Sequence, residues 1–301
     1  MSNYFYQNQY VSIIGAGKIS YSIANLFLQN KIKILSIISR SKESADKLAA
    51  KFKINISSNN YNDLDKNTSI FILAVPDNEI ETIAEHLAKQ NINFKESLFI
   101  HLSGAQDISL LKALKDKGAA IASIHFMQTF PTKEIVDLKS EYVVIETDED
   151  EVFNFLFELS VRFNLKPLKL NSSEKTLYHL SGVFACNFLL SNLYLAELTY
   201  KDLSISENIP MFRYMDNIIT NTLKNAKENG AANSISGPIV RGDLDTIKKH
   251  IEVMQKPEYK NSNIIEMYIV QSEMLLKILE QKNKGLTESQ KNIRDYLISI
   301  K

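Results

Sequence analysis

The chain has 301 residues, of which 35 are basic and 35 acidic, so its formal net charge is zero. A chain of this length is expected to form two domains and to bury a core without disulfides or a metal. Its single cysteine, Cys186, excludes an internal disulfide, and the balanced charge argues against nucleic acid as a partner. The N-terminus has neither the cationic segment nor the apolar core of a signal peptide, which predicts a cytoplasmic protein.

The first half of the sequence alternates short apolar runs with amphipathic segments, which is typical of a parallel sheet covered by helices. We predict strands at residues 10–14, 34–39, 69–75, 98–102, 119–125, 142–146 and 167–170. We predict helices at residues 18–29, 42–52, 78–90 and 148–163. Ser41 is the expected cap of the second helix, and Asn78 with Glu81 has the spacing of a capping box for the third.

After about residue 171 the strand signals disappear, and the sequence predicts helices only. These are expected at residues 173–199, 209–225, 244–254, 262–280 and 287–298, with a capping box of Thr287 and Gln290 at the start of the last. The predicted fold class is therefore α/β, with a doubly wound, mainly parallel sheet in residues 1–170 and an all-α domain in residues 171–301.

Residues 177–198 contain no Lys, Arg or Asp and are long enough to span a bilayer. They nevertheless include His179, Asn187, Asn192 and Glu197, and no aromatic belt or positive flank marks their ends. A helix that is apolar nearly all round is also what the core of a helical domain or a dimer requires. We therefore predict a buried helix and no membrane partner.

A glycine turn follows the first expected strand and leads directly into a helix. Gly15 permits a tight turn, and Gly17 allows the backbone to approach a pyrophosphate on the helix N-terminus. The third position of the motif holds Ser20, a small residue that still permits close packing of helix on strand. In this context we predict a Rossmann domain that binds a dinucleotide, rather than a turn that merely needs two glycines. The predicted contacts are Gly15, Ala16, Gly17, Lys18 and Ile19.

The end of the second expected strand indicates which dinucleotide binds. An Asp or Glu at this place would prefer a ribose 2′-hydroxyl, whereas the sequence here is Ser39-Arg40-Ser41, with no acidic residue before Glu43. A guanidinium between two hydroxyls suits a 2′-phosphate. Only five of the 35 basic residues are arginines, which gives Arg40 more weight than a lysine would have. The sequence therefore predicts NADP(H), bound by Ser39, Arg40 and Ser41.

In an open parallel sheet, ligands lie beyond the carboxyl ends of the strands. Two histidines, His101 and His125, stand at such ends, and each is as compatible with a structural role as with a functional one. We predict further cofactor contacts at Val75, Pro76 and Ser103, and substrate contacts at Ser103, Gly104 and His125. No grouping of His, Cys, Asp or Glu has the spacing of a metal site, so no metal is expected.

Four residues of the long helix, Lys175, His179, Val183 and Asn187, follow one another at intervals of four and should share one stripe. A lysine or histidine whose pKa is brought toward neutrality can donate the proton that accompanies hydride transfer to a carbonyl. A solvated lysine and a buried structural histidine are equally compatible with the spacing.

A loop stiffened by proline, Ser236–Asp243, carries Arg241 directly before a helix that Asp243 is expected to cap. Arg241 can bind a substrate carboxylate, or it can pair with Asp243 or Asp245 and hold the loop. Both interpretations stay open at this point.

Six segments together resemble one family: YVSIIGAGKIS, SIFILAVPDNEI, FIHLSGA, SIHFMQTFP, LYHLSGVFACNFLLSNL and SISGPIVRGD. They are similar to proteins in which a Rossmann-like domain precedes a helical domain of unknown function. That family is related to pyrroline-5-carboxylate reductase, ketopantoate reductase and the 6-phosphogluconate dehydrogenase superfamily, and some members serve as alternative ketopantoate reductases. The resemblance extends from Tyr10 to about His250.

The resemblance implies an enzyme that uses NADPH to reduce a small 2-oxo acid, 2-dehydropantoate, to pantoate in pantothenate synthesis. It also implies a homodimer formed through the C-terminal helical domain. Lys175 occupies the kind of place at which ketopantoate reductases have their general acid, with His179 as the alternative, while Asn187 and Arg241 orient the substrate. The asparagines of that family at later turns are replaced here by His179 and Val183.

Two other functions are compatible with these residues. One is reduction of a cyclic imine, as in pyrroline-5-carboxylate reductase, for which Lys175 would matter little because a protonated imine needs no strong acid. The other is a regulator that binds NADP without turnover, in which Lys175 and His179 are structural.

Overall fold

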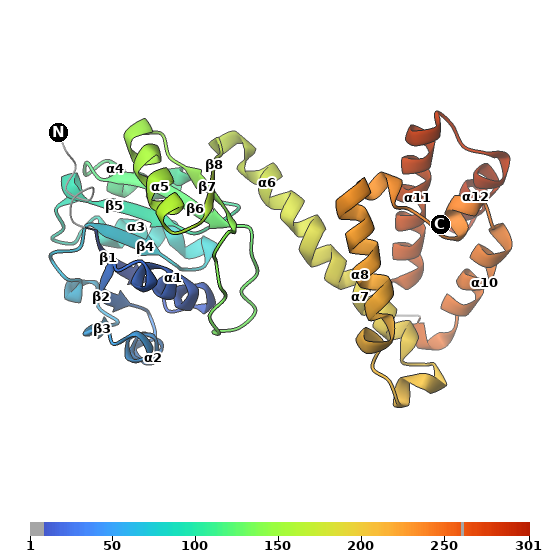
Figure 1. Cartoon of the computed structure of the whole chain (residues 1–301), viewed down its shortest axis with the longest axis horizontal. Helices are drawn as coiled ribbons and strands as arrows, with labels where there is room; N and C mark the ends of the chain where they lie inside the picture. The colour runs from blue at the N-terminus through green and yellow to red at the C-terminus, as the bar shows by residue number, and fades with distance from the viewer. Residues whose placement is uncertain (1–8, 260–261) are drawn as a thin grey trace. The chain divides into compact units, whose positions relative to one another are not determined.

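The computed structural model describes residues 9–259 and 262–301. The chain divides into two compact units, Met1–Phe188 and Leu189–Lys301. The first unit contains the sheet and the second contains helices (Figure 1). The predicted domain boundary at residue 170 marks the end of the strands and stays a prediction.

An eight-stranded sheet forms the centre of the first unit. Its strands follow the order β3-β2-β1-β4-β5-β6-β7-β8, and every neighbouring pair is parallel except β6 and β7. The first six strands have the order of a Rossmann fold, which confirms the predicted fold class. The bounds are β1 Tyr10–Ile14, β2 Lys33–Ile38, β3 Ile56–Ser58, β4 Ile70–Leu73, β5 Leu98–His101, β6 Ala120–Phe126, β7 Tyr142–Glu146 and β8 Lys166–Lys169.

Helices cover both faces of this sheet, because side chains of a strand alternate between its faces. Ile13 of β1 packs into a core shared with α1 (Lys18–Gln29), α2 (Lys42–Phe52) and α5 (Asp150–Arg162). The next residue, Ile14, packs into a second core. That core is shared with two helices, α3 (Ile80–Leu87) and α4 (Lys112–Lys115).

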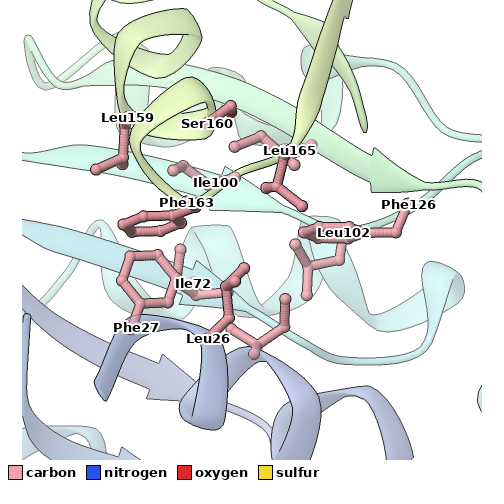
Figure 2. A pocket seen from close by; sticks show the side chains of 12 residues that line it. Leu26, Phe27, Ile72, Ile100, Leu102, Phe126, Leu159, Ser160, Phe163 and Leu165 are labelled. Carbon is pink, nitrogen blue, oxygen red and sulfur yellow. The ribbon is translucent and has the colours of Figure 1, made fainter. Parts of the chain in front are cut away.

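Figure 2 shows a cavity in the first of these cores, between the sheet and the helices α1 and α5. Its lining is apolar except for Ser160, whose hydroxyl donates to the carbonyl of Leu156 at 2.7 Å. Because the one polar group is already bonded within its own helix, this cavity offers nothing to orient a polar ligand. It belongs to the packing of the core.

Most predicted elements are present. The predicted bounds agree with the structure for β1, α1, α2 and β7, and Ser41 caps α2 by accepting a hydrogen bond from the N–H of Ser44 at 3.2 Å. The strand β3 was not predicted, because its sequence, Ile-Ser-Ser, has no apolar run and only pairing with β2 defines it.

The predicted capping box of Asn78 and Glu81 is wrong. Asn78 lies inside a 3-10 turn, Asp77–Glu79, that leads into α3, and no side-chain hydrogen bond caps that helix. The turn begins after Pro76, and its tighter winding places Asn78 within the turn instead of before the first helical residue.

The second unit consists of helices in its described part. Its bounds are α7 Phe188–Tyr200, α8 Met211–Asn229, α9 Pro238–Arg241, α10 Leu244–Met254, α11 Ile264–Asn283 and α12 Glu288–Ser299. The predicted caps are confirmed, with Thr287 and Gln290 bonded reciprocally and Asp243 accepting from the N–H of Thr246. Within the described residues, no helix has the length and apolar character needed to cross a membrane.

The long helix predicted at residues 173–199 is three segments. The helix α6 (Lys175–Gly182) passes into a π-helical stretch, Val183–Asn187, and then into α7. A π turn takes an extra residue, so it rotates whatever follows relative to what precedes. Lys175 and His179 keep the predicted spacing within α6, but the predicted stripe does not continue regularly to Val183 and Asn187, which lie in the π-helical stretch. Lys175 is buried, whereas His179 and Asn187 are exposed.

Candidate functional site

The glycine turn lies where the strand order reverses, between β1 and β4. Gly15 has a φ of +105°, and a Cβ placed on it would lie 2.1 Å from the carbonyl oxygen of Ala74 at the end of β4. Its N–H donates to the carbonyl of Ile38, the last residue of β2, at 2.7 Å. Only glycine fits this backbone, and the turn thereby brings the carboxyl ends of three strands together at the ligand-binding edge of a Rossmann sheet.

The N-terminus of α1 follows this turn and has no side-chain cap. Gly17 is the N-cap residue without a capping hydrogen bond, and both Gly17 and Lys18 are exposed. Ser20 is buried and donates its hydroxyl to the carbonyl of Gly15 at 3.0 Å, which fixes the turn against the helix. The N–H groups of the first helical turn are consequently available to an anion such as a pyrophosphate.

The end of β2 presents Arg40 to solvent. Ser39 is half-buried, with its N–H bonded to the carbonyl of Ser58 at 2.9 Å. Arg40 is exposed and forms no ion pair with any described residue. Ser41 uses its oxygen in the cap of α2, so its hydroxyl hydrogen remains available. A cation with no ion-pair partner in the described part of the chain, two residues after the Ile38 carbonyl to which Gly15 donates, suits a second phosphate.

At the end of β4, Val75 is half-buried and Pro76 is exposed. A γ-carbon of Val75 lies 3.0 Å from the position of a Cβ on Gly15. Val75 therefore forms one wall beside the glycine turn.

His101 at the end of β5 is structural. Its Nδ1 accepts from the N–H of Ser103 at 3.2 Å, so the proton resides on Nε2, which donates to the carbonyl of Asp107 at 3.2 Å. Burial, and then the charge of Lys175, lower the pKa of His101 to about 3. The hydroxyl of Ser103 accepts from the N–H groups of Ala105 and Gln106 and holds the loop.

His125 near the end of β6 packs between Gly104 and Tyr178. A Cβ on Gly104 would lie 2.7 Å from Nε2 of this ring, so only glycine leaves room for it. Its Nδ1 is 2.9 Å from the hydroxyl of Tyr178, and the two rings meet edge to face. Burial, and then the charges of Lys175 and His179, lower the pKa of His125 to about 4, while burial raises the pKa of Tyr178 to about 12. Both groups are neutral near pH 7.

Lys175 begins α6 and is buried against the sheet. Its Nζ lies 2.6 Å from Oε2 of Glu146 and also donates to the hydroxyl of Ser123. Burial lowers the pKa of Lys175, and the bond with Glu146 opposes that effect. The lysine and the carboxylate are 1% and 2% exposed.

The remaining predicted residues are exposed. His179 lies on α6, Asn187 ends the π-helical stretch, and Arg241 is the last residue of α9 in the second unit. Arg241 forms no ion pair with a described residue. The pKa of Asp243 is lowered mainly by the hydrogen bonds that it accepts from Thr246, and to a smaller extent by the charge of Arg241. In the described part of the chain, no three potential metal ligands come together.

Sequence reasoning missed two residues, Tyr178 and Glu146. Tyr178 precedes His179 by one residue, yet only the fold places its hydroxyl on His125. Glu146 follows the buried run Val143–Ile145 at the end of β7. Because a buried charge needs a partner, a carboxylate at the end of such an apolar run could have predicted a buried ion pair.

Residues 5–126 match the model of the Rossmann-like domain, and residues 141–274 match that of the domain of unknown function DUF2520. The chain thus joins a Rossmann-like domain to a DUF2520 domain. The resemblance that the sequence motifs carried is confirmed at this level. A search of curated protein sequences found no match.

Several solved structures are similar to this chain. A protein from Bacteroides fragilis, provisionally named an NADP oxidoreductase, has a TM-score of 0.75 at 22% identity, over 88% of this chain and 97% of that chain. A protein from Thermotoga maritima has a TM-score of 0.65 at 23% identity, with coverage of 91% and 99%. A reductive aminase from Aspergillus terreus, solved with NADPH4, cyclohexanone and allyl amine, has a TM-score of 0.58 at 13% identity, with coverage of 96% and 92%. At these identities the likeness shows the fold alone.

Proposed function

We propose that this protein is an NADPH-dependent reductase of a C=O or C=N bond in a small molecule. The observation that carries the proposal is the uncapped glycine turn at the reversal of strand order, with Arg40 exposed at the end of the neighbouring strand and unpaired among the residues that the structure describes. A helix N-terminus with free N–H groups and a nearby guanidinium fit the two phosphate groups that distinguish NADP(H).

The residues present fit this cofactor. The backbone of Gly15, Ala16, Gly17, Lys18 and Ile19 would hold the pyrophosphate, and Ser39, Arg40 and Ser41 would hold the 2′-phosphate. Val75 and Pro76, at the end of β4, would line the path toward the nicotinamide. The loop of Ser103 and Gly104 comes at the end of the neighbouring strand, β5, and would lie beside that path. When bound, NADPH supplies the hydride, and the protein supplies position and electrostatics.

Reduction also requires a proton at the oxygen or nitrogen of the substrate. Of the predicted donors, Lys175 is enclosed with Glu146, whereas the hydroxyl of Tyr178 is half-buried beside His125. We propose that Tyr178 donates this proton and that His125 orients its hydroxyl. A neutral phenol that is held by one hydrogen bond can deliver a proton as negative charge develops on the substrate.

2-Dehydropantoate is the first candidate substrate, and the sequence motifs support it. Its carboxylate would need a cation, for which Arg241 is the proposed partner, with Asn187 and His179 as further polar contacts. These roles stay proposals.

A cyclic or open-chain imine is the second candidate. The observation that favours it is the enclosed Lys175–Glu146 pair, which leaves the weakly acidic Tyr178 as the proton source. A protonated imine becomes an amine on receiving hydride and makes little demand on an acid.

The second unit supports assembly of a homodimer. Large apolar side chains are exposed on α7 and α8, among them Leu190, Tyr194, Tyr214 and Ile218. An apolar surface of this kind on a soluble unit marks a contact with another protein, and a second copy of the chain is the proposed partner. Sedimentation of wild type and Ile218→Asp tests it: a dimer should dissociate on this substitution.

The function is tested by mixing the protein with NADPH and separate 2-oxo acids and imines while following NADPH absorbance. Turnover of 2-dehydropantoate alone supports the first candidate, and turnover of imines alone supports the second. Calorimetric binding of NADPH without oxidation by any compound would indicate a binding protein, and absence of binding heat would refute the proposal.

A further inference from the structure

A row of polar side chains crosses three neighbouring strands in the first unit. His101 of β5 pairs in register with Ser123 of β6, and Ser123 pairs with Glu146 of β7. Residues paired in this way point to the same face of a sheet. The next position in this row, on β4, is the buried Leu73, so the row lies beside an apolar core, and all three polar side chains are buried.

Lys175 covers this row from the first turn of α6. Its ammonium group contacts Ser123 and Oε2 of Glu146. The other carboxylate oxygen of Glu146 accepts from the N–H of Ile108 at 3.1 Å and from the hydroxyl of Ser172 at 2.7 Å. The carboxylate is therefore bonded through both oxygens to two segments besides α6, and the pair forms a fully connected polar cluster.

The helix carries Tyr178 three residues after Lys175, nearly one turn further along. The hydroxyl of Tyr178 reaches Nδ1 of His125, two residues after Ser123 on the same strand. The cluster and the Tyr178 contact thus join the same helix to the same strand at two points. A rotation or shift of the first turn of α6 would separate Tyr178 from His125.

We propose that the Glu146–Lys175 pair is a positioning device that fixes the start of α6 on the sheet, so that Tyr178 is held against His125. Lys175 itself exchanges no proton with the substrate. This inference rests on the proposed reductase function. A lysine side chain that is 2% exposed, with a carboxylate and a hydroxyl on its ammonium group, has no surface for a substrate.

The test compares Lys175→Met, Glu146→Gln and the double variant. Lys175→Met leaves the buried carboxylate of Glu146 without its counter-charge, and Glu146→Gln leaves the buried ammonium group of Lys175 without its own. Either change is strongly destabilising, whereas removal of both charges is much better tolerated. We expect Lys175→Met to lower the melting temperature and to reduce kcat by about tenfold or more. The double variant should regain the melting temperature and about a third or more of wild-type kcat, with KM close to wild type.

A catalytic lysine gives a different result. Loss of a general acid reduces rate by roughly 10²–10⁴-fold whatever the stability of the fold. A double variant that melts like wild type but stays about 100-fold slower would therefore overturn the proposal. The matched control is the exposed pair Lys169–Asp150, 3.0 Å apart, for which Lys169→Met with Asp150→Asn should leave kcat and melting temperature unchanged.

A spectroscopic measurement separates this inference from the proposed function. The nuclear Overhauser effect between the rings of His125 and Tyr178, assigned by its loss in His125→Phe, should weaken in Lys175→Met and return in the double variant. This readout needs no substrate, so it tests the positioning role even if no compound is reduced. An undiminished effect between these two rings in a folded Lys175→Met protein would contradict the proposal.

A second measurement needs no variant. Limited acetylation of the wild-type protein, with and without NADPH, should leave Lys175 unmodified while Lys169 on the surface reacts. Modification of both lysines at similar rates would show that Lys175 is accessible and would overturn the inference.

Discussion

The two parts of the candidate site, the glycine turn and the polar row, are built in opposite ways. The glycine turn uses backbone geometry within six residues, and its one charged neighbour, Arg40, is exposed and unpaired among the described residues. The polar row uses side chains from three strands and a helix, and its charges are buried and compensated. The glycine turn leaves backbone N–H groups and a guanidinium available for a ligand. In the polar row, by contrast, the polar groups bond one another and stabilise the fold.

The largest expected effect is at Gly15. A Gly15→Val substitution places a side chain 2.1 Å from the Ala74 carbonyl at a φ of +105°, and we expect a loss of roughly 2–4 kcal/mol in the free energy of unfolding. NADPH binding should be lost with it. Urea unfolding and calorimetry measure the two effects. In Gly17→Ala the nearest atom is 3.9 Å away, so its stability should stay near that of wild type; equal destabilisation of both variants would refute the argument from geometry.

Acid should have the next largest effect, through His101 of the polar row and through His125, which contacts Tyr178. In the folded protein the pKa of His101 is lowered to about 3 and that of His125 to about 4, both mainly by burial, while an unfolded histidine has a pKa of about 6.5. Protons therefore bind the unfolded chain more tightly, and the free energy of unfolding decreases as pH falls below about 6.5 toward these values. Each histidine contributes about 1.4 kcal/mol per pH unit within that window.

Urea midpoints at pH 7, 6 and 5 measure this dependence. His125→Phe keeps a ring between Gly104 and Tyr178 but cannot titrate, so its slope should be smaller than that of wild type by about the contribution of one histidine. An unchanged slope would show that His125 is protonated in the folded protein at these pH values.

The predicted effect of Arg40→Ala is smaller and confined to the cofactor. A charged hydrogen bond contributes about 1.5–3 kcal/mol, so NADPH affinity should fall by roughly 10–100-fold, while NADH affinity should not change. Calorimetry with both nucleotides checks this. The neighbouring Lys42 already pairs with Asp46, and Lys42→Ala is the control. A parallel loss of both affinities in Arg40→Ala would place the guanidinium away from the 2′-phosphate.

The smallest expected effect is at the adjacent cap. Ser41→Ala removes the acceptor for the N–H of Ser44 at the start of α2 and should cost about 1 kcal/mol of stability. Thermal unfolding measures it, with Ser41→Asp as the matched variant because aspartate also caps a helix. If Ser41→Ala melts like wild type, the cap contributes nothing measurable.

Local features were predictable from the sequence. The first strand, the glycine turn, the helix after it and the serine cap of α2 depend on neighbouring residues, and the structure has them where they were expected. Two features were not predictable. The three-residue strand β3 is defined by its pairing with β2. The 3-10 turn before α3 is set by the direction of the chain after Pro76.

By itself the sequence determined the alternation of strands and helices, the place of the glycine turn and the change to helices near residue 170. Periodicity and turn chemistry act over a few residues, so they can be read along the chain. Only the tertiary structure decided that Lys175 is buried in an ion pair with Glu146 and that Tyr178 contacts His125. It also decided that both ring nitrogens of His101 are hydrogen-bonded to the backbone of the loop that follows. Strand register and the packing of the first turns of α6 on the sheet bring these groups together, and neither leaves a local pattern in the sequence.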